Sequence, residues 1–224
     1  MPNGLHSLAK DGILRVAINT GNRALVQQDG QRLTGVSPAL AQRLAGEIGA
    51  RMEAVMYKGA GQVFADAGND LWDVGFLAID ATRAQRIAFT KPYIVIEATY
   101  AVRRNAHFQA IHEVDRTGVQ VLTAKGSAYD MYLTETLRHA TLERFGTPPE
   151  SFAAFRDGRC DAVAGVRASL DDFFDGDPSV RVLPGALTSV RQAMVLPDRD
   201  DPRIADLNDF VARAIADDFV AANS

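Results

Sequence analysis

One segment of the sequence combines residue types that could bind an anion. It is 81–93, ATRAQRIAFTKPY, and it follows a short apolar run that ends at Ile79. In a parallel α/β sheet, ligands bind beyond the carboxyl ends of the strands. Arg83 would then lie just past a strand end, where its planar guanidinium could hold a carboxylate through two hydrogen bonds. The alternative is a surface arginine that pairs with a nearby aspartate.

Recognised catalytic and cofactor signatures are missing from the sequence. It has no Walker A sequence, dinucleotide fingerprint, HExxH pair or CxxC pair, so we expect neither a cofactor nor a metal. The nearest approach to a nucleophile elbow is 35–39, GVSPA, where Ser37 is instead expected to be a helix N-cap with Pro38 at the first helical position. The stretch 171–178 lacks the ligand spacing of a calcium loop and is expected to be a solvated loop. Four histidines without metal-ligand spacing are expected in surface or structural roles: His6, His107, His112 and His139.

Composition excludes several classes of protein. The 224 residues include 24 Lys plus Arg and 28 Asp plus Glu, a net charge of −4, and 47% are hydrophobic. This is ordinary globular composition, and the acidic excess argues against non-specific nucleic-acid binding. Cys160 is the only cysteine, which rules out an intrachain disulfide and a cysteine-cluster zinc site. A small-molecule partner is the better expectation.

Strand and helix patterns alternate along the chain. The expected strands are 12–19, 52–57, 72–79, 118–122, 160–166 and 180–183, and the expected helices are 38–48, 62–67, 129–137, 151–155 and 204–215. Such alternation predicts an α/β fold with parallel strands. Two β-rich stretches, 93–102 and 190–196, are candidates for segments that cross between two lobes. We therefore predict a discontinuous first lobe, 1–101 with 191–224, and a second lobe, 102–190.

The N-terminal residues carry no visible export signal. Met1–His6 lack a basic stretch that leads into an apolar run. Our expectation is that such a signal was removed, rather than that the protein works in the cytoplasm.

The motif residues together resemble those of a known family. The arrangement of Asp73-Val74, Thr82-Arg83 and 89–93, FTKPY, is similar to the signature of the periplasmic solute-binding proteins of the polar amino-acid-binding type. The resemblance extends over nearly the whole chain, through further short matches: 14–16, Gly35, Gly126-Ser127, Gly158 and 161–163.

The resemblance implies a fold, a site and partners. The fold would be the two-lobed type II periplasmic binding protein fold, with two hinge strands and a ligand that closes the lobes. Arg83 would hold the ligand carboxylate, and the Gly126-Ser127 turn would face the same carboxylate from the second lobe. The protein would be a periplasmic monomer that delivers a small anionic or zwitterionic ligand to the membrane permease of an ABC importer.

Departures from the family pattern alter the expected ligand. Val166, followed by Arg167, stands where members that bind α-amino acids usually have an acidic residue for the ammonium. Ala78, with Phe76 nearby, replaces a hydroxyl residue at the end of the third strand. The stretch from Asn19 to Asn22 lacks the usual aromatic side chain; Tyr57 is either a stacking face or a core residue. We expect a small carboxylate or an unusual amino-acid-like ligand.

Two other functions are possible on this scaffold. The first is a dehydratase-like enzyme that acts on a small cyclic carboxylate; Asp80 and Glu97 are its candidate acids, and each is also explained by a structural role. The second is a ligand-sensing module of a receptor, which would be expected to continue into a membrane helix beyond Ser224.

Overall fold

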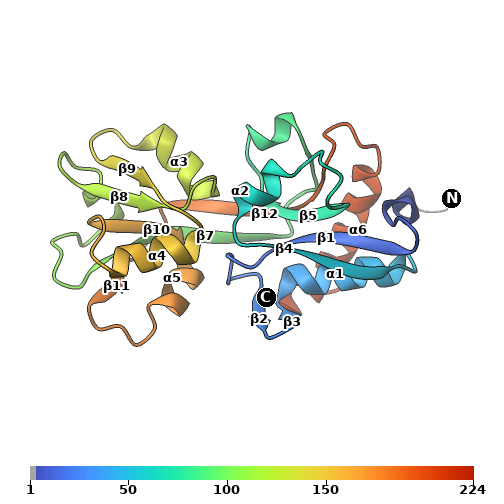
Figure 1. Cartoon of the computed structure of the whole chain (residues 1–224), viewed down its shortest axis with the longest axis horizontal. Coiled ribbons are helices and arrows are strands. Elements are labelled where there is room, and N and C mark those ends of the chain that lie inside the picture. The colour runs from blue at the N-terminus through green and yellow to red at the C-terminus, as the bar shows by residue number, and fades with distance from the viewer. Residues whose placement is uncertain (1–3) are drawn as a thin grey trace. The chain divides into compact units, whose positions relative to one another are not determined.

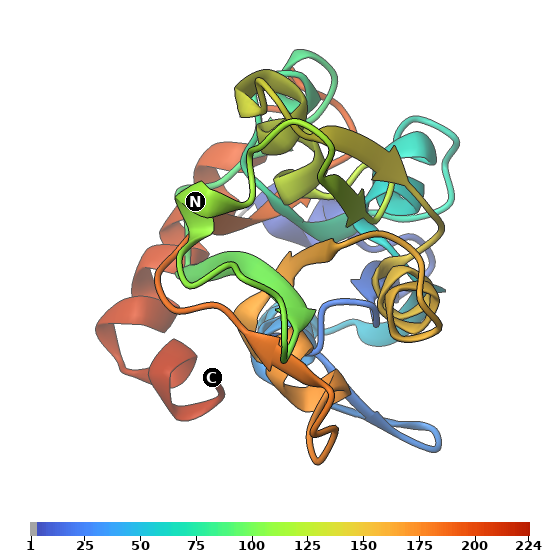
Figure 2. The same cartoon turned by 90° about the vertical axis from the view of Figure 1, so that its left-hand side faces the viewer.

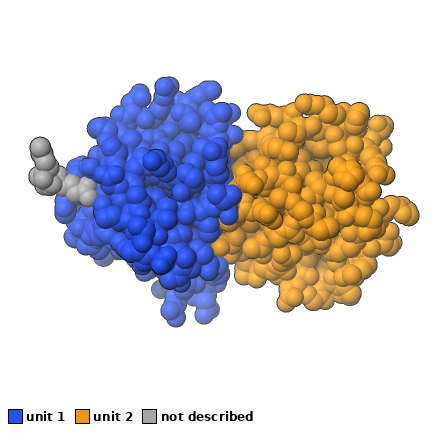
Figure 3. Space-filling view, turned by 180° about the vertical axis from the view of Figure 1, so that it is seen from behind, with its two compact units in different colours: residues 1–20, 25–95, 191–224 blue, residues 21–24, 96–190 orange. Residues whose placement is uncertain are grey.

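The computed structural model describes residues 4–224, which form two compact units. Unit 1 comprises 4–20, 25–95 and 191–224, and unit 2 comprises 21–24 and 96–190 (Figure 3). Residues 1–3, part of the segment inspected for an export signal, lie outside the described residues. Within 4–224, none of the helices has the length and apolar character needed to span a bilayer.

The sheet of unit 1 is built on parallel strands. β1 (Ile13–Asn19) lies between β4 (Arg51–Tyr57) and β5 (Val74–Ala78), and both neighbours run parallel to it (Figure 1). β12 (Thr188–Leu196) runs antiparallel to β5 and also pairs with β6 (Ala88–Phe89). Side chains on β5 are buried along its whole length, as expected for a parallel strand covered on both faces.

Helices and a hairpin complete unit 1. The elements are α1 (Val36–Glu47), α2 (Ala60–Ala65), α6 (Ile204–Ala216), α7 (Phe219–Ala222), the 3₁₀ helices Gly4–Leu8 and Arg83–Gln85, and the hairpin of β2 (Gln27–Asp29) and β3 (Arg32–Thr34). α1 packs against β1 and β4. Figure 2 shows the hairpin as a blue arm and the two C-terminal helices, in red, following one another.

The strands of unit 2 run in mixed directions. Its strands are β7 (Ile94–Arg103), β8 (Gln120–Thr123), β9 (Thr141–Arg144), β10 (Ala162–Val166) and β11 (Val180–Val182). β8 is parallel to both β9 and β10, whereas β7 is antiparallel to β10 and β11. Its helices are α3 (Ala128–Thr136), α4 (Pro148–Arg156), α5 (Arg167–Phe173) and the 3₁₀ helix Ile111–Glu113.

Two strands contribute residues to both units. β7 begins in unit 1 and enters unit 2 at Ile96, and β12 leaves unit 2 after Val190. They include the two β-rich stretches that the sequence indicates as crossing segments.

Each unit has its own apolar core. In unit 1, Trp72, Leu77 and Val63 are among the buried residues of one cluster. In unit 2, the rings of Phe152 and Phe174 pack together, with 6.1 Å between centroids. Burial of one such side chain contributes about 1.5 to 3 kcal/mol, so each unit gains substantially from its own cluster.

The prediction that Ser37 caps α1 is wrong. The N-cap is Gly35, whose φ is 97°, and no side chain accepts a hydrogen bond there. A Cβ at residue 35 would lie 2.5 Å from the carbonyl oxygen of Leu25, so only glycine fits this turn. The Ser37 hydroxyl instead shares a buried hydrogen bond with the Tyr93 hydroxyl, 3.0 Å away.

Several short elements of the structure are missing from the sequence prediction. They include the hairpin strands β2 and β3, the strands β6 and β9, and the helices α5 and α7. Residues 171–173, expected in a loop, belong to α5. All of these elements are seven residues long or shorter, too short for a hydrophobic period to distinguish them from loops.

Candidate functional site

Predicted site residues of unit 1 gather at one edge of its sheet. Asn19 and Tyr57 are the last residues of β1 and β4 and lie opposite each other in the parallel register. Ala78 is the last residue of the neighbouring parallel strand β5, and Arg83 follows it after a short loop. Strand direction therefore brings Asn19, Tyr57, Ala78 and Arg83 to the same edge.

Arg83 is buried at that edge rather than exposed. Its side chain is 1% exposed, and Nη1 donates to the carbonyl oxygen of Ala78 at 3.0 Å. The backbone is held by Asp80, whose Oδ1 accepts from the N–H groups of Thr82 and Arg83 at 2.8 and 3.0 Å. Burial lowers the pKa of Arg83 to about 10, and the charge of Asp80 opposes this shift. Burial removes water from the charged guanidinium, and a bound anion would stabilise that charge.

Aromatic side chains near this edge are packed into unit 1. Tyr57 belongs to the core cluster, and its hydroxyl donates to Asp66 Oδ2 at 3.0 Å. Burial, together with that hydrogen bond, raises the pKa of Tyr57 to about 12. Phe76 is 5% exposed and meets the Tyr93 ring edge-on, with 5.9 Å between centroids. Of the two roles open to Tyr57, its contacts fit the core residue.

The loop after β1 carries a buried hydrogen-bond acceptor. Asn19 is half-buried at the strand end, and Asn22 is half-buried three residues later. The amide oxygen Oδ1 of Asn22 is buried and has no hydrogen-bond partner among the described residues. A buried acceptor without a donor is costly, so a donor group at this point would be favourable.

In unit 2, the turn after β8 is braced by a side chain that sequence reasoning missed. Asp130 accepts the N–H of Gly126 on Oδ2 at 2.8 Å and the Nε of Arg144 on Oδ1 at 2.8 Å. Ser127 is the N-cap of α3, and its Oγ accepts the N–H of Asp130 at 3.1 Å. Gly126 has a φ of 72°, in the region that favours glycine. The three-residue spacing of Ser127 and Asp130 is the signal of a capped helix start that could have revealed this bracing.

Val166 and Arg167 lie at the corresponding end of β10. Val166 is 8% exposed and is the N-cap of α5. The Arg167 guanidinium donates to the carbonyl oxygens of Leu183, at 3.2 Å, and Gly185, and its Nε is 3.3 Å from Glu97 Oε2. These contacts anchor Arg167 within unit 2.

Parallel strands also bring the predicted residues of unit 2 together. β8 and β10 run in the same direction, so Gly126-Ser127 and Val166-Arg167 follow strand ends at the same edge of the sheet. As for metals, no group of three or more His, Cys, Asp and Glu residues within 4–224 is arranged so that it could hold a metal ion.

Comparison with known proteins identifies the family of this chain. The model of the bacterial extracellular solute-binding proteins, family 3, matches residues 14–222. A curated relative, the glutamine-binding protein of Geobacillus stearothermophilus, is 26% identical over 110 residues, 49% of this chain. The match spans 42% of that relative, less than half of its length.

Solved structures share the fold at low sequence identity. The solute receptor for L-cysteine of Neisseria gonorrhoeae is 19% identical, with a TM-score of 0.86 over 98% of this chain and 91% of that one. An ancestral amino-acid-binding protein, described as a precursor of cyclohexadienyl dehydratase, is 21% identical, with a TM-score of 0.83 over 98% of this chain and 96% of that one. The predicted type II periplasmic binding protein fold is thereby confirmed, as is the resemblance drawn from the motifs. The chain belongs to the bacterial extracellular solute-binding proteins, family 3.

Proposed function

We propose that this protein captures a small carboxylate or amino-acid-like ligand between its two units and delivers it to the membrane permease of an ABC importer. The proposed location is the periplasm, and the proposed working form is a monomer. Support comes from the extracellular solute-binding family and from relatives that are named for binding glutamine and L-cysteine. Units 1 and 2 are the proposed lobes, with β7 and β12 as the hinge strands.

Arg83 is the observation that carries the proposal. Its guanidinium is almost wholly buried at the carboxyl end of a parallel strand, beside the ends of two others. Bidentate hydrogen bonds to a carboxylate are a favoured geometry for such a side chain. The ligand carboxylate would offset part of the desolvation that lowers the pKa of Arg83 to about 10.

The second contact to the carboxylate is proposed to come from the start of α3. The N–H of Gly126 already donates to Asp130, and that of Asp130 donates to Ser127 Oγ, so the Ser127 hydroxyl and the N–H groups of Ala128 and Tyr129 are better donors for a ligand. These N–H groups have no partner inside a helix, and the helix dipole favours an anion there.

The proposed ligand does not depend on a charged partner for an ammonium group. Val166 offers no carboxylate, and the neighbouring Arg167 is anchored by Glu97 and two carbonyl oxygens. Asn22 Oδ1 could accept a hydrogen bond from a neutral or weakly charged donor of the ligand. This pattern favours an organic acid, or an amino-acid derivative whose amino group is modified.

Closure of the two units is proposed to follow from ligand binding. A ligand that contacts both units binds the closed form more tightly and therefore shifts the population toward it. Micromolar affinity corresponds to about −8 kcal/mol, which a bidentate arginine contact and a few N–H bonds in a dry cleft could supply.

Dehydration of a cyclic carboxylate is the less favoured alternative. One solved structure with this fold is described as a dehydratase precursor, so a dehydratase activity is an alternative function. Asp80 is occupied by backbone N–H groups, and Glu97 is 55% exposed and pairs with Arg167. A general acid at neutral pH is usually a desolvated carboxyl without a cationic partner, so neither residue suits the role.

Calorimetry on arginine variants tests the proposed site. A thermal-shift screen of organic acids and amino acids would first supply a ligand, since ligand at 100 times Kd stabilises the native state by about 2.7 kcal/mol. We expect Arg83→Ala to abolish binding and Arg83→Lys to weaken it at least about tenfold. Arg86→Ala is the matched control, because Arg86 is in the same segment but stacks on Phe64. Unchanged affinity in a folded Arg83→Lys protein would refute the assignment.

A further inference from the structure

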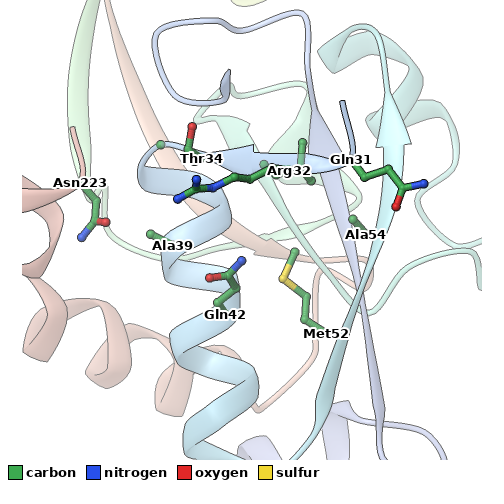
Figure 4. A pocket seen from close by; sticks show the side chains of 10 residues that line it. Gln31, Arg32, Thr34, Ala39, Gln42, Met52, Ala54 and Asn223 are labelled. Carbon is green, nitrogen blue, oxygen red and sulfur yellow. The ribbon is translucent and has the colours of Figure 1, made fainter. Parts of the chain in front are cut away.

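None of the predicted site residues lines a groove that lies on unit 1. Its volume is about 590 Å³, within the range of small-molecule sites. It is bordered by the β2–β3 hairpin, the first half of α1, the strand β4 and Asn223, which follows α7 (Figure 4). All of these elements belong to unit 1, so the groove exists within a single unit.

Charge in the groove is of one sign. Arg32 is the only charged residue among those that line it. Its guanidinium is exposed and makes no hydrogen bond or ion pair with any part of the chain that the structure describes. The side-chain amides of Gln31 and Gln42 likewise have no partner within 4–224. In the view of Figure 4, Arg32 lies above Gln42 and Met52.

Apolar groups line the same groove. Leu33, Ala39, Met52 and Ala54 are each half-buried, so part of their surface faces solvent. A methionine thioether adapts to ligands of different shape. The groove thus combines one unpaired cation, neutral amides and apolar surface, without a carboxylate among its lining residues.

We propose that this groove is a second binding site, for a small organic carboxylate with an apolar body. The carboxylate would accept two hydrogen bonds from Arg32, the amide of Gln42 would add a further hydrogen bond, and the apolar body would cover Met52 and Ala54. The site is independent of the function proposed above, because it needs neither Arg83 nor closure of the two units.

Methionine methyl resonances give a direct test of this second site. The protein is labelled with methyl-¹³C methionine and titrated with hexanoate, and with hexylammonium as the probe of opposite charge. Met52 lines the groove, whereas Met56 is 44% exposed on the same strand and does not line it. We expect hexanoate to shift the Met52 resonance saturably and to leave Met56 unmoved, and we expect hexylammonium to shift neither.

Two arginine variants decide whether the charge matters. Arg32→Gln is expected to weaken hexanoate binding at least about tenfold, because a charge-assisted hydrogen bond is lost. Arg51→Gln is the matched control, because Arg51 is exposed on β4 and does not line the groove. Its Nη2 lies 3.2 Å from Glu53 Oε2. An independent variant, Gln42→Ala, is expected to weaken binding less. A Met52 shift that is linear in hexanoate, equal for hexylammonium or unchanged in Arg32→Gln would overturn the proposal.

Discussion

Val166 is the residue that most sharply limits the proposed ligand. It is buried at the N-cap of α5, where the side chain presents no charge to an ammonium group. The next residue, Arg167, is a cation that is anchored by Glu97 and carbonyl oxygens, so it offers no negative charge to an ammonium group either. A single substitution at Val166 can therefore test whether this position determines the class of ligand.

We predict that Val166→Asp confers binding of α-amino acids with a free ammonium group. Aspartate is a favoured N-cap residue, so α5 should tolerate it. A charge-assisted hydrogen bond of about 1.5 to 3 kcal/mol corresponds to a gain of roughly tenfold or more in affinity. Calorimetry with a set of amino acids measures the gain.

Val166→Asn is the control for that substitution. Asparagine caps a helix equally well but carries no charge. If Val166→Asn gained the same affinity, or if Val166→Asp gained none while still folded, the ammonium would be recognised elsewhere.

At the scale of elements, a buried hydrogen bond between Ser37 and Tyr93 connects α1 to the segment before β7. Ser37 Oγ and Tyr93 OH are 3.0 Å apart, and both residues are buried. Burial raises the pKa of Tyr93, so its hydroxyl stays protonated at neutral pH. The same ring supports Phe76 on β5.

A double-mutant cycle measures the interaction energy of the two hydroxyl groups. Ser37→Ala and Tyr93→Phe should each lower the free energy of unfolding by about 0.5 to 1.5 kcal/mol, or more where a buried partner is left unpaired. Because both remove the same bond, the double variant should lose less than the sum of the two. Urea unfolding of the four proteins gives the coupling energy, and strict additivity would show that the hydroxyls do not interact.

The start of α6 contains an ion pair whose contribution depends on pH. Asp201 accepts the backbone N–H of Arg203 at 2.9 Å, and its Oδ2 lies 2.6 Å from Arg203 Nη2. The hydrogen bond from the Arg203 side chain is the main reason why the pKa of Asp201 is lowered. An unfolded aspartate has a pKa of about 3.9, so this contribution is fully present above about pH 4 and is lost as the pH falls through the lower folded value.

We predict that Asp201→Asn lowers the free energy of unfolding by about 1 to 2 kcal/mol at pH 7. The difference from the unsubstituted protein should begin to shrink below about pH 4, where the carboxylate becomes protonated in the unfolded chain, and it should shrink until the native carboxylate is protonated as well. Urea unfolding at pH 7 and pH 3 compares the two. Asp200→Asn, at a side chain that is 89% exposed, is the control and should change little at either pH. A difference that is the same at both pH values would contradict the prediction.

At the scale of the whole molecule, the two units and their two shared strands provide the parts of a hinged binding protein. Each unit has its own apolar core, and the proposed function treats each unit as a lobe, with β7 and β12 as the hinge strands. The proposed function requires that such a movement be coupled to the ligand.

We predict that a saturating ligand lowers the radius of gyration of the protein. The reason is that a ligand held by both units favours their closed arrangement. Small-angle scattering with and without ligand measures the change, and Arg83→Lys at the same ligand concentration should show a smaller one. A ligand that binds tightly without any change in the radius would argue against closure.

The sequence alone determined the alternating strands and helices, the family signature and the location of Arg83 after a strand end. These features depend on local periodicity and on motif residues that lie close together in the chain. Parallel strand direction then brings Asn19, Tyr57 and Ala78 to the same edge as Arg83, as the sheet prediction implies.

Only the tertiary structure decided which groups are already occupied. Ser37 bonds to Tyr93, 56 residues away, instead of capping its helix, and Tyr57 is directed into the core. Arg167 is held by Glu97, 70 residues distant in sequence. Such contacts join segments that sequence spacing does not relate, and a polar side chain takes whichever buried partner folding brings to it, because leaving it unpaired is costly.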